Sequence, residues 1–133
     1  KGFEVVARED TNGTFDSALE AAKKILNEQP DITAIMCGND QMAVAAKTAL
    51  NLAGNDQTVV YSIDGSPDIK KELKKADGQI AGTVAQSPVN IGKKAVDIAL
   101  DILEGKDFEK ETSVDVFMIN KENVEMYGAD GWQ

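Results

Sequence analysis

The chain alternates between short apolar runs and longer helical patterns, and this alternation constrains its fold more than any other feature. Three runs rich in apolar or β-branched residues each end at a polar corner, and a helix start follows at once. These predicted strands cover 32–37, 58–63 and 80–85. Two further runs, 3–7 and 114–119, bring the number of predicted strands to five.

Helical periodicity fills the intervals between these runs. The predicted helices extend from residue 16 to the proline at 30, over 40–53, from 66 to about 75, and over 87–104. Such an order predicts parallel strands joined by right-handed crossovers. We therefore expect one α/β lobe over 1–133, a three-layer, mostly parallel five-stranded sheet with helices on both faces.

Local signals mark where these helices begin. Ser17 and Glu20 have the spacing of a capping box, and Asp40 is the expected cap of the second helix. Ser66-Pro67 and Ser87-Pro88 each combine an N-cap residue with a proline at the first helical position. In the helix after Ser66, we expect Ile69 and Leu73 to face inward and Lys70, Lys71, Lys74 and Lys75 to face solvent.

Composition excludes several classes of function. The chain carries 23 acidic and 14 basic residues, so a nucleic-acid or anionic-membrane surface would work against its net charge of -9. It contains no histidine and one cysteine, Cys37, which removes disulfide frameworks, the usual zinc sites and imidazole catalysis. We predict no enzyme activity, no metal and no cofactor, and we interpret Cys37 as a small core residue.

Polar residues stand at the carboxyl ends of the predicted strands, where open α/β sheets bind ligands. They are Asn39, Asp64 and Gln86. One carboxylate and two amides suit a neutral, polyhydroxylated ligand, whereas the glycine-rich phosphate motifs are absent. Each of the three could instead be a turn former or a helix cap. Phe15 could lie against a ligand or pack on Leu19.

Three motifs carry a resemblance to a known family. They are residues 35–43 (IMCGNDQMA), 60–67 (VYSIDGSP) and 78–88 (GQIAGTVAQSP). In this order and spacing the chain resembles the C-terminal lobe of the type I periplasmic sugar-binding proteins of ABC transporters, the ribose/galactose type. The fold implied is a periplasmic-binding-protein-like lobe of the Rossmann or flavodoxin-like kind.

The resemblance implies that Asn39, Asp64 and Gln86 hydrogen-bond a monosaccharide, a pentose or hexose, and that Phe15 supplies an aromatic face for it. It further implies an N-terminal lobe missing from this chain, an ABC transporter permease as partner, and a periplasmic or otherwise extracytoplasmic location, lipid-anchored in a Gram-positive source. We expect the start of the chain to be a fragment boundary.

The helix over 87–104 is apolar around more than one narrow stripe, which indicates contacts on two sides. In the family the matching helix crosses the hinge and packs on the other lobe. We therefore predict that this chain either folds the helix back onto its own sheet or exchanges it with a second copy, forming a homodimer.

Two alternatives stay open. A sugar-responsive repressor of the LacI type shares this effector fold and would carry a DNA-binding headpiece before it. A phosphoacceptor receiver domain is also five-stranded, and here Glu9-Asp10 would be its acidic pair, Asp64 its acceptor, Thr83 its hydroxyl and Lys121 its lysine.

Overall fold

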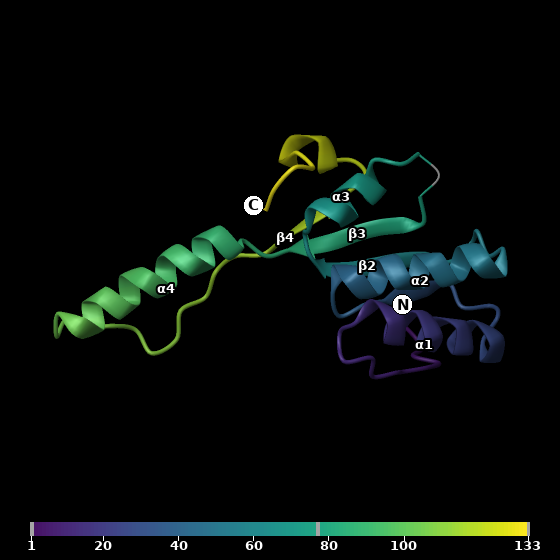
Figure 1. Ribbon diagram of the computed structural model, residues 1–133, viewed down its shortest axis with the longest axis horizontal. Coiled ribbons are helices and arrows are strands. Elements are labelled where there is room, and N and C mark those ends of the chain that lie inside the picture. Colours follow the sequence, from purple (N-terminus) through teal and green to yellow (C-terminus); the bar gives the residue numbers. More distant parts are fainter. Residues whose placement is uncertain (1, 77, 133) are drawn as a thin grey trace.

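A computed structural model describes residues 2–76 and 78–132 as a lobe with one projecting arm (Figure 1). Helices and strands alternate along most of the chain, as the sequence predicts. The elements are α1 (Phe15–Glu28), β1 (Ala34–Met36), α2 (Asp40–Ala53), β2 (Val59–Asp64), α3 (Pro67–Leu73), β3 (Ile80–Ala85), α4 (Pro88–Leu103), β4 (Phe117–Asn120) and the 3-10 helix η1 (Val124–Tyr127).

The sheet has four strands in the order β1-β2-β3-β4, and it is mostly parallel, which confirms the fold class. The strands differ from the expectation in two details. Residues 3–7 form no strand: they pair with no strand of the sheet, although the outer edge of β1 is open, and Phe3 and Val5 are exposed. β4 runs antiparallel to β3, because the chain makes its excursion through α4 and returns from the same end of the sheet.

The described helices of the lobe cover one face of the sheet, not both. On β2, Val60 and Ser62 are buried while Val59 and Ile63 are exposed, as expected when side chains alternate between a covered and an open face. Right-handed crossovers that progress in one direction, β1 to β2 to β3, place α2 and α3 on the same side. The ion pair between Lys47 on α2 and Glu72 on α3 joins these neighbours.

The core lies between this helical layer and the sheet. It is built largely from small and branched side chains of α2, α3 and the strands. Its fully buried members include Ala43, Leu50, Val60, Ile69, Ile80, Ala85 and Ile119. Phe117 and Tyr127 stack with ring centroids 5.1 Å apart and fix η1 beside β4.

Three of the local helix predictions need correction. The first helix begins at Phe15 after Thr14, so Ser17 and Glu20 lie inside it and form no capping box. The side chain of Asn39, not that of Asp40, caps α2. Lys70 does not face solvent: it is fully buried, and its Nζ donates a hydrogen bond to the carbonyl oxygen of Gly131, 2.5 Å away.

The predicted cap at Ser66 is confirmed, since its Oγ accepts a hydrogen bond from the Ile69 amide.

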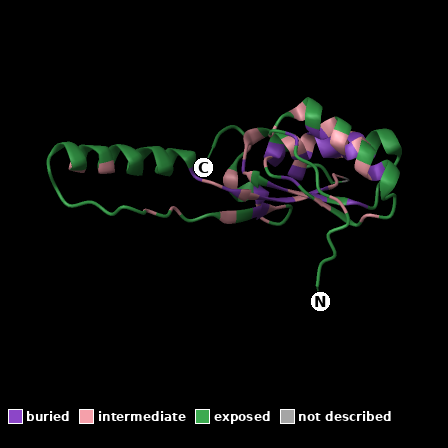
Figure 2. Cartoon of the chain, turned by 90° about the horizontal axis from the view of Figure 1, so that it is seen from below, coloured by how far each residue is buried: buried purple, intermediate pink, exposed green. Residues whose placement is uncertain are grey.

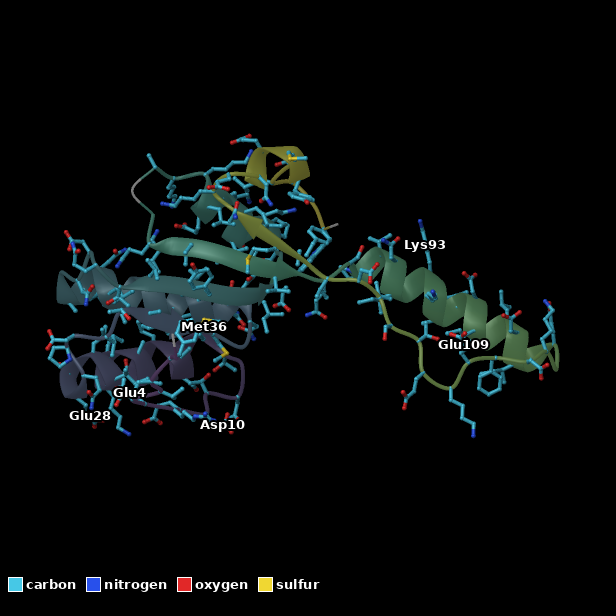
Figure 3. The ribbon with its side chains drawn as sticks, turned by 180° about the vertical axis from the view of Figure 1, so that it is seen from behind. Glu4, Asp10, Glu28, Met36, Lys93 and Glu109 are labelled. Atoms are coloured by element: carbon cyan, nitrogen blue, oxygen red, sulfur yellow. The ribbon has the colours of Figure 1, made fainter. Side chains whose placement is uncertain are left out.

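The arm consists of α4 and the extended segment that returns to β4 (Figure 1). No residue of α4 is buried, and Figure 2 shows it exposed along its length while buried residues gather in the lobe. Lys93 on α4 and Glu109 on the return segment lie far from Met36 at the edge of the sheet (Figure 3). The prediction that α4 folds back onto its own sheet is therefore wrong, and exchange with a second copy stays a prediction.

Within the described part of the chain, none of the helices combines the length and the apolar character needed to cross a membrane.

Candidate ligand-binding site

Asp64 and Gln86 lie side by side at the carboxyl edge of the sheet. Asp64 is the last residue of β2, and Gln86 follows β3 directly. The side-chain Nε2 of Gln86 donates a hydrogen bond to Asp64 Oδ1 at 3.0 Å. The backbone amide of Gln86 donates to the backbone carbonyl oxygen of Asp64 at 3.1 Å. The backbone amide of Asp40 approaches Asp64 Oδ2 at 3.5 Å. Two of the three predicted residues therefore meet directly.

Asn39 holds the corner between β1 and α2. Its Oδ1 accepts from the Met42 amide at 2.8 Å, and its Nδ2 donates to the Gly13 carbonyl oxygen at 3.0 Å. Each atom thus has one protein partner, and a side-chain amide keeps one further N–H and one further lone pair for a ligand. The link between Asn39 and the other two residues is the next residue, Asp40, whose backbone amide approaches the Asp64 carboxylate.

Asp40 is a buried carboxylate at the same edge, only 3 % exposed. Its Oδ1 accepts from Ser62 Oγ at 2.5 Å and from Thr83 Oγ1 at 2.7 Å, and its Oδ2 accepts from the Ser66 amide at 2.6 Å. These bonds satisfy the carboxylate inside the protein. Sequence reasoning assigned Asp40 to the cap because both Asn and Asp cap helices, and the donors that distinguish the two residues are more than 20 positions away along the chain.

The surroundings of Asp64 favour its protonated form relative to an exposed aspartate. Burial raises the pKa of this carboxyl, and the negative charge of Asp40 adds to the effect. The Asp40 amide and the Gln86 side chain oppose it, and the net pKa is above the ordinary value of 3.8. A ligand hydroxyl that donates to Asp64 would therefore replace solvation that the carboxylate has partly lost.

A shallow cleft of about 540 Å³ lies beside Asn39, between the β1–α2 corner and the N-terminal loop. Its walls come from Arg8, Glu9, Asp10, Thr11, Gly13, Gly38, Asn39 and Met42. The sequence did not indicate this loop as part of the site, although the turn signal Asn12-Gly13 marks the point where it meets Asn39. Phe15 begins α1 and is half-buried, and it does not line this cleft, so its contact with a ligand stays a prediction.

Cys37 belongs to the core, as predicted. Burial raises the pKa of its thiol to about 11, so the reactive thiolate is disfavoured. Among residues 2–76 and 78–132, no cluster of three or more His, Cys, Asp or Glu side chains could hold a metal ion.

Comparison with known proteins identifies the family of this chain. A family model described as a periplasmic binding protein domain matches residues 1–107. The chain belongs to this family. The mostly parallel α/β sheet agrees with this membership.

Among relatives of this periplasmic binding protein, the ribose import binding protein of Salmonella typhimurium is 34% identical over 120 residues, covering 90% of this chain and 40% of the relative. The D-allose-binding periplasmic protein of Escherichia coli is 33% identical over 100 residues, covering 74% of this chain and 32% of the relative. The chain thus spans well under half the length of the relatives it matches.

Solved structures agree with the fold. A solute-binding protein from Actinobacillus succinogenes with bound D-allose has a TM-score of 0.87 at 29% identity, covering 93% of this chain and 44% of that one. One from Bacillus halodurans with bound myo-inositol has a TM-score of 0.86 at 29% identity, covering 95% and 43%.

These relatives support the transport-binding family over the two alternatives. The geometry also argues against a receiver domain. Because β4 is antiparallel, Lys121 lies at the opposite end of the sheet from Asp64, and its Nζ donates to the carbonyl oxygens of Ala76 and Gly78. The Thr83 hydroxyl donates a hydrogen bond to Asp40 Oδ1, and Thr83 is fully buried.

Proposed function

We propose that this chain is the sugar-binding C-terminal lobe of an extracytoplasmic solute-binding protein that delivers a monosaccharide, a pentose or hexose, to an ABC transporter permease. The observation that carries the proposal is the Asp64–Gln86 pair at the carboxyl edge of the sheet. The names of the ribose-binding and allose-binding relatives support a monosaccharide as ligand.

The pair suits a sugar for chemical reasons. The Asp64 carboxylate can accept hydrogen bonds from two adjacent hydroxyls, while the amides of Gln86 and Asn39 both donate and accept. Hydrogen bonds to a charged group contribute about 1.5–3 kcal/mol each. Phe15 is the proposed aromatic contact. The relatives are named as binding proteins, which supports a role in binding without catalysis.

A second lobe completes the site in this proposal. The exposed apolar surface of α4, with Val96, Leu100 and Leu103 each at least half exposed, is the surface on which that lobe would pack. A single lobe offers few side chains to offset about 4 kcal/mol or more of lost ligand freedom. We therefore expect weak or undetectable sugar binding by the isolated chain and tight binding when both lobes are present.

Calorimetry with ribose, allose and galactose tests the proposal on a protein that carries both lobes. Asp64→Asn keeps the size of the side chain but removes its charge, and we expect sugar affinity to fall about 10- to 100-fold. Asp68→Asn is the matched control, because Asp68 is exposed on α3 and forms an exposed ion pair with Lys71. Unchanged affinity in Asp64→Asn would refute the site, and no binding of any sugar by the unmodified protein would refute the function.

A further inference from the structure

The backbone at Asp64 has an unusual conformation for a residue with a side chain. Asp64 has a φ of 131° and the following Gly65 has a φ of 77°. A non-glycine residue in this region is strained, and such strain persists only where surrounding contacts impose it. The contacts that impose it here should therefore be identifiable.

The contacts that impose the conformation of Asp64 come from the residues that flank it on both sides. The hydroxyl of Ser62, two positions before Asp64, donates a hydrogen bond to Asp40 Oδ1. The backbone amide of Ser66, two positions after Asp64, donates a hydrogen bond to Asp40 Oδ2. Thr83 on the neighbouring strand donates to the same carboxylate and accepts the Gly65 amide at 3.2 Å. The Asp40 carboxylate is therefore hydrogen-bonded to the strand before Asp64, to the turn after it and to the adjacent strand.

A carboxylate matches this set of donors, because each of its two oxygens can accept hydrogen bonds. Ser62, Thr83 and Ser66 present three protons to the two oxygens of Asp40. An asparagine in its place would offer only one accepting oxygen. If its N–H group faced the Ser66 amide, two donors would oppose each other; if it faced the hydroxyls, Ser62 and Thr83 would have to accept instead of donate, and the bonds that they now donate to position 40 would be lost. Asn39 already caps α2, so the Asp40 side chain is not needed for that purpose.

We propose that Asp40 is a positioning residue that holds Asp64 in its strained conformation and so presents the Asp64 carboxylate to the sugar. The inference rests on the proposed function for its consequence in binding, and on the hydrogen bonds alone for its consequence in structure. Asp40 itself does not touch the ligand in this arrangement; it acts through Asp64.

The structural arm of the test uses this chain and needs no ligand. Amide hydrogen exchange is followed at Ser66 and Gly65, with the Val60 amide, which donates to Gln79 within the sheet, as the reference for global opening. In Asp40→Asn we expect exchange at Ser66 to rise at least about 10-fold relative to Val60. An unchanged ratio overturns the inference.

Thr58→Val is the matched control. Thr58 is also fully buried, and its Oγ1 donates to the Ile32 carbonyl oxygen at the other end of the sheet. This variant loses a buried hydrogen bond without touching the Asp40 set. We expect lower overall stability with an unchanged Ser66-to-Val60 ratio, and a raised ratio would show that any destabilisation loosens the turn, which overturns the inference.

The binding arm is a double-mutant cycle on sugar affinity in the two-lobed protein. If Asp40 acts through Asp64, Asp40→Asn weakens binding about 10-fold in the unmodified background and changes it less than twofold in the Asp64→Ala background. Equal losses in both backgrounds overturn the inference. Absence of sugar binding in the unmodified protein refutes the proposed function instead, and the exchange measurement then still decides whether Asp40 holds the turn.

Discussion

Gly65 lies against Ala85 so closely that no side chain fits between them. A Cβ on Gly65 would lie 2.5 Å from the Cβ of Ala85 and 2.9 Å from its Cα. Ala85 ends β3 and is paired in register with Asp64, so this contact sets how tightly the turn after β2 packs beside the neighbouring strand. The absence of a side chain at position 65 is a requirement of the candidate site.

Gly65→Ala should therefore be strongly destabilising. A left-handed backbone at a residue with a Cβ costs about 1–2 kcal/mol, and overpacking adds about 1–3 kcal/mol, so we expect a loss of about 2–5 kcal/mol in urea unfolding. Gly92→Ala in α4 is the control, because nothing lies within 4 Å of a Cβ there. Equal stability of the two variants would contradict the packing described for Gly65.

Glu72→Gln should lower stability in a pH-dependent way. Burial acts to raise the pKa of Glu72, but hydrogen bonds from Lys47 and Lys75 outweigh it, so the pKa is below its ordinary value of 4.5. A depressed folded-state pKa contributes stability that is present above 4.5 and lost as the pH falls through the folded pKa.

We expect Glu72→Gln to lose about 1 kcal/mol at pH 7 and to approach the unmodified protein in acid, measured by urea unfolding across this range. Glu20→Gln, which breaks an exposed pair with Lys23, should change little at any pH. A pH-independent loss in Glu72→Gln would show that the effect is not electrostatic.

Lys70→Met should change the alkaline stability profile. Burial lowers the pKa of Lys70 below 10.5, although the charges of Asp130 and Asp40 oppose the shift. Between the folded pKa and 10.5 the unfolded chain binds more protons than the folded one, so Lys70 makes stability rise with pH in that window. In Lys70→Met this rise should disappear. An identical alkaline profile in both proteins would show that Lys70 titrates as an exposed lysine.

The apolar surface of α4 should promote association of the isolated chain. Its polar stripe carries Lys93 and Lys94 in the first half and Asp97 and Asp101 in the second, so antiparallel pairing with a second copy brings opposite charges together. Light scattering should show a mass that rises with concentration.

The triple variant Val96→Ser, Leu100→Ser and Leu103→Ser should abolish this association. It should change the free energy of unfolding of the monomer by less than about 0.5 kcal/mol, because no residue of α4 is buried. Leu50→Ala, in the core, should instead cost about 2–5 kcal/mol. A monomer at all concentrations would contradict the exchange of α4 with a second copy.

Features that depend on neighbouring residues could be predicted from the sequence. The Ser66-Pro67 helix start is a local signal, and the structure confirms it. The strand-end positions of Asp64 and Gln86 follow from apolar runs that stop at a polar corner, and the structure brings these two residues together.

Features set by distant partners could not be predicted. Lys70 appears on a lysine-rich helix, and its burial depends on Gly131, 61 positions along the chain. The choice between Asn39 and Asp40 as the cap depends on Ser62 and Thr83. The run over 3–7 has strand-forming residues, but a strand also needs hydrogen bonds to a neighbouring strand, and this run makes none although the outer edge of β1 is open.

The pairing of Ala85 with Phe117 has a consequence for how the arm is attached. The chain leaves the sheet after Ala85 and returns to it at Phe117, so the arm, residues 88–116, is an insertion whose two ends meet. A short hairpin turn could replace it and leave β3 and β4 joined as a plain β-hairpin. The lobe could then be produced without the exposed apolar surface of α4, and the arm could be joined as a unit to another hairpin.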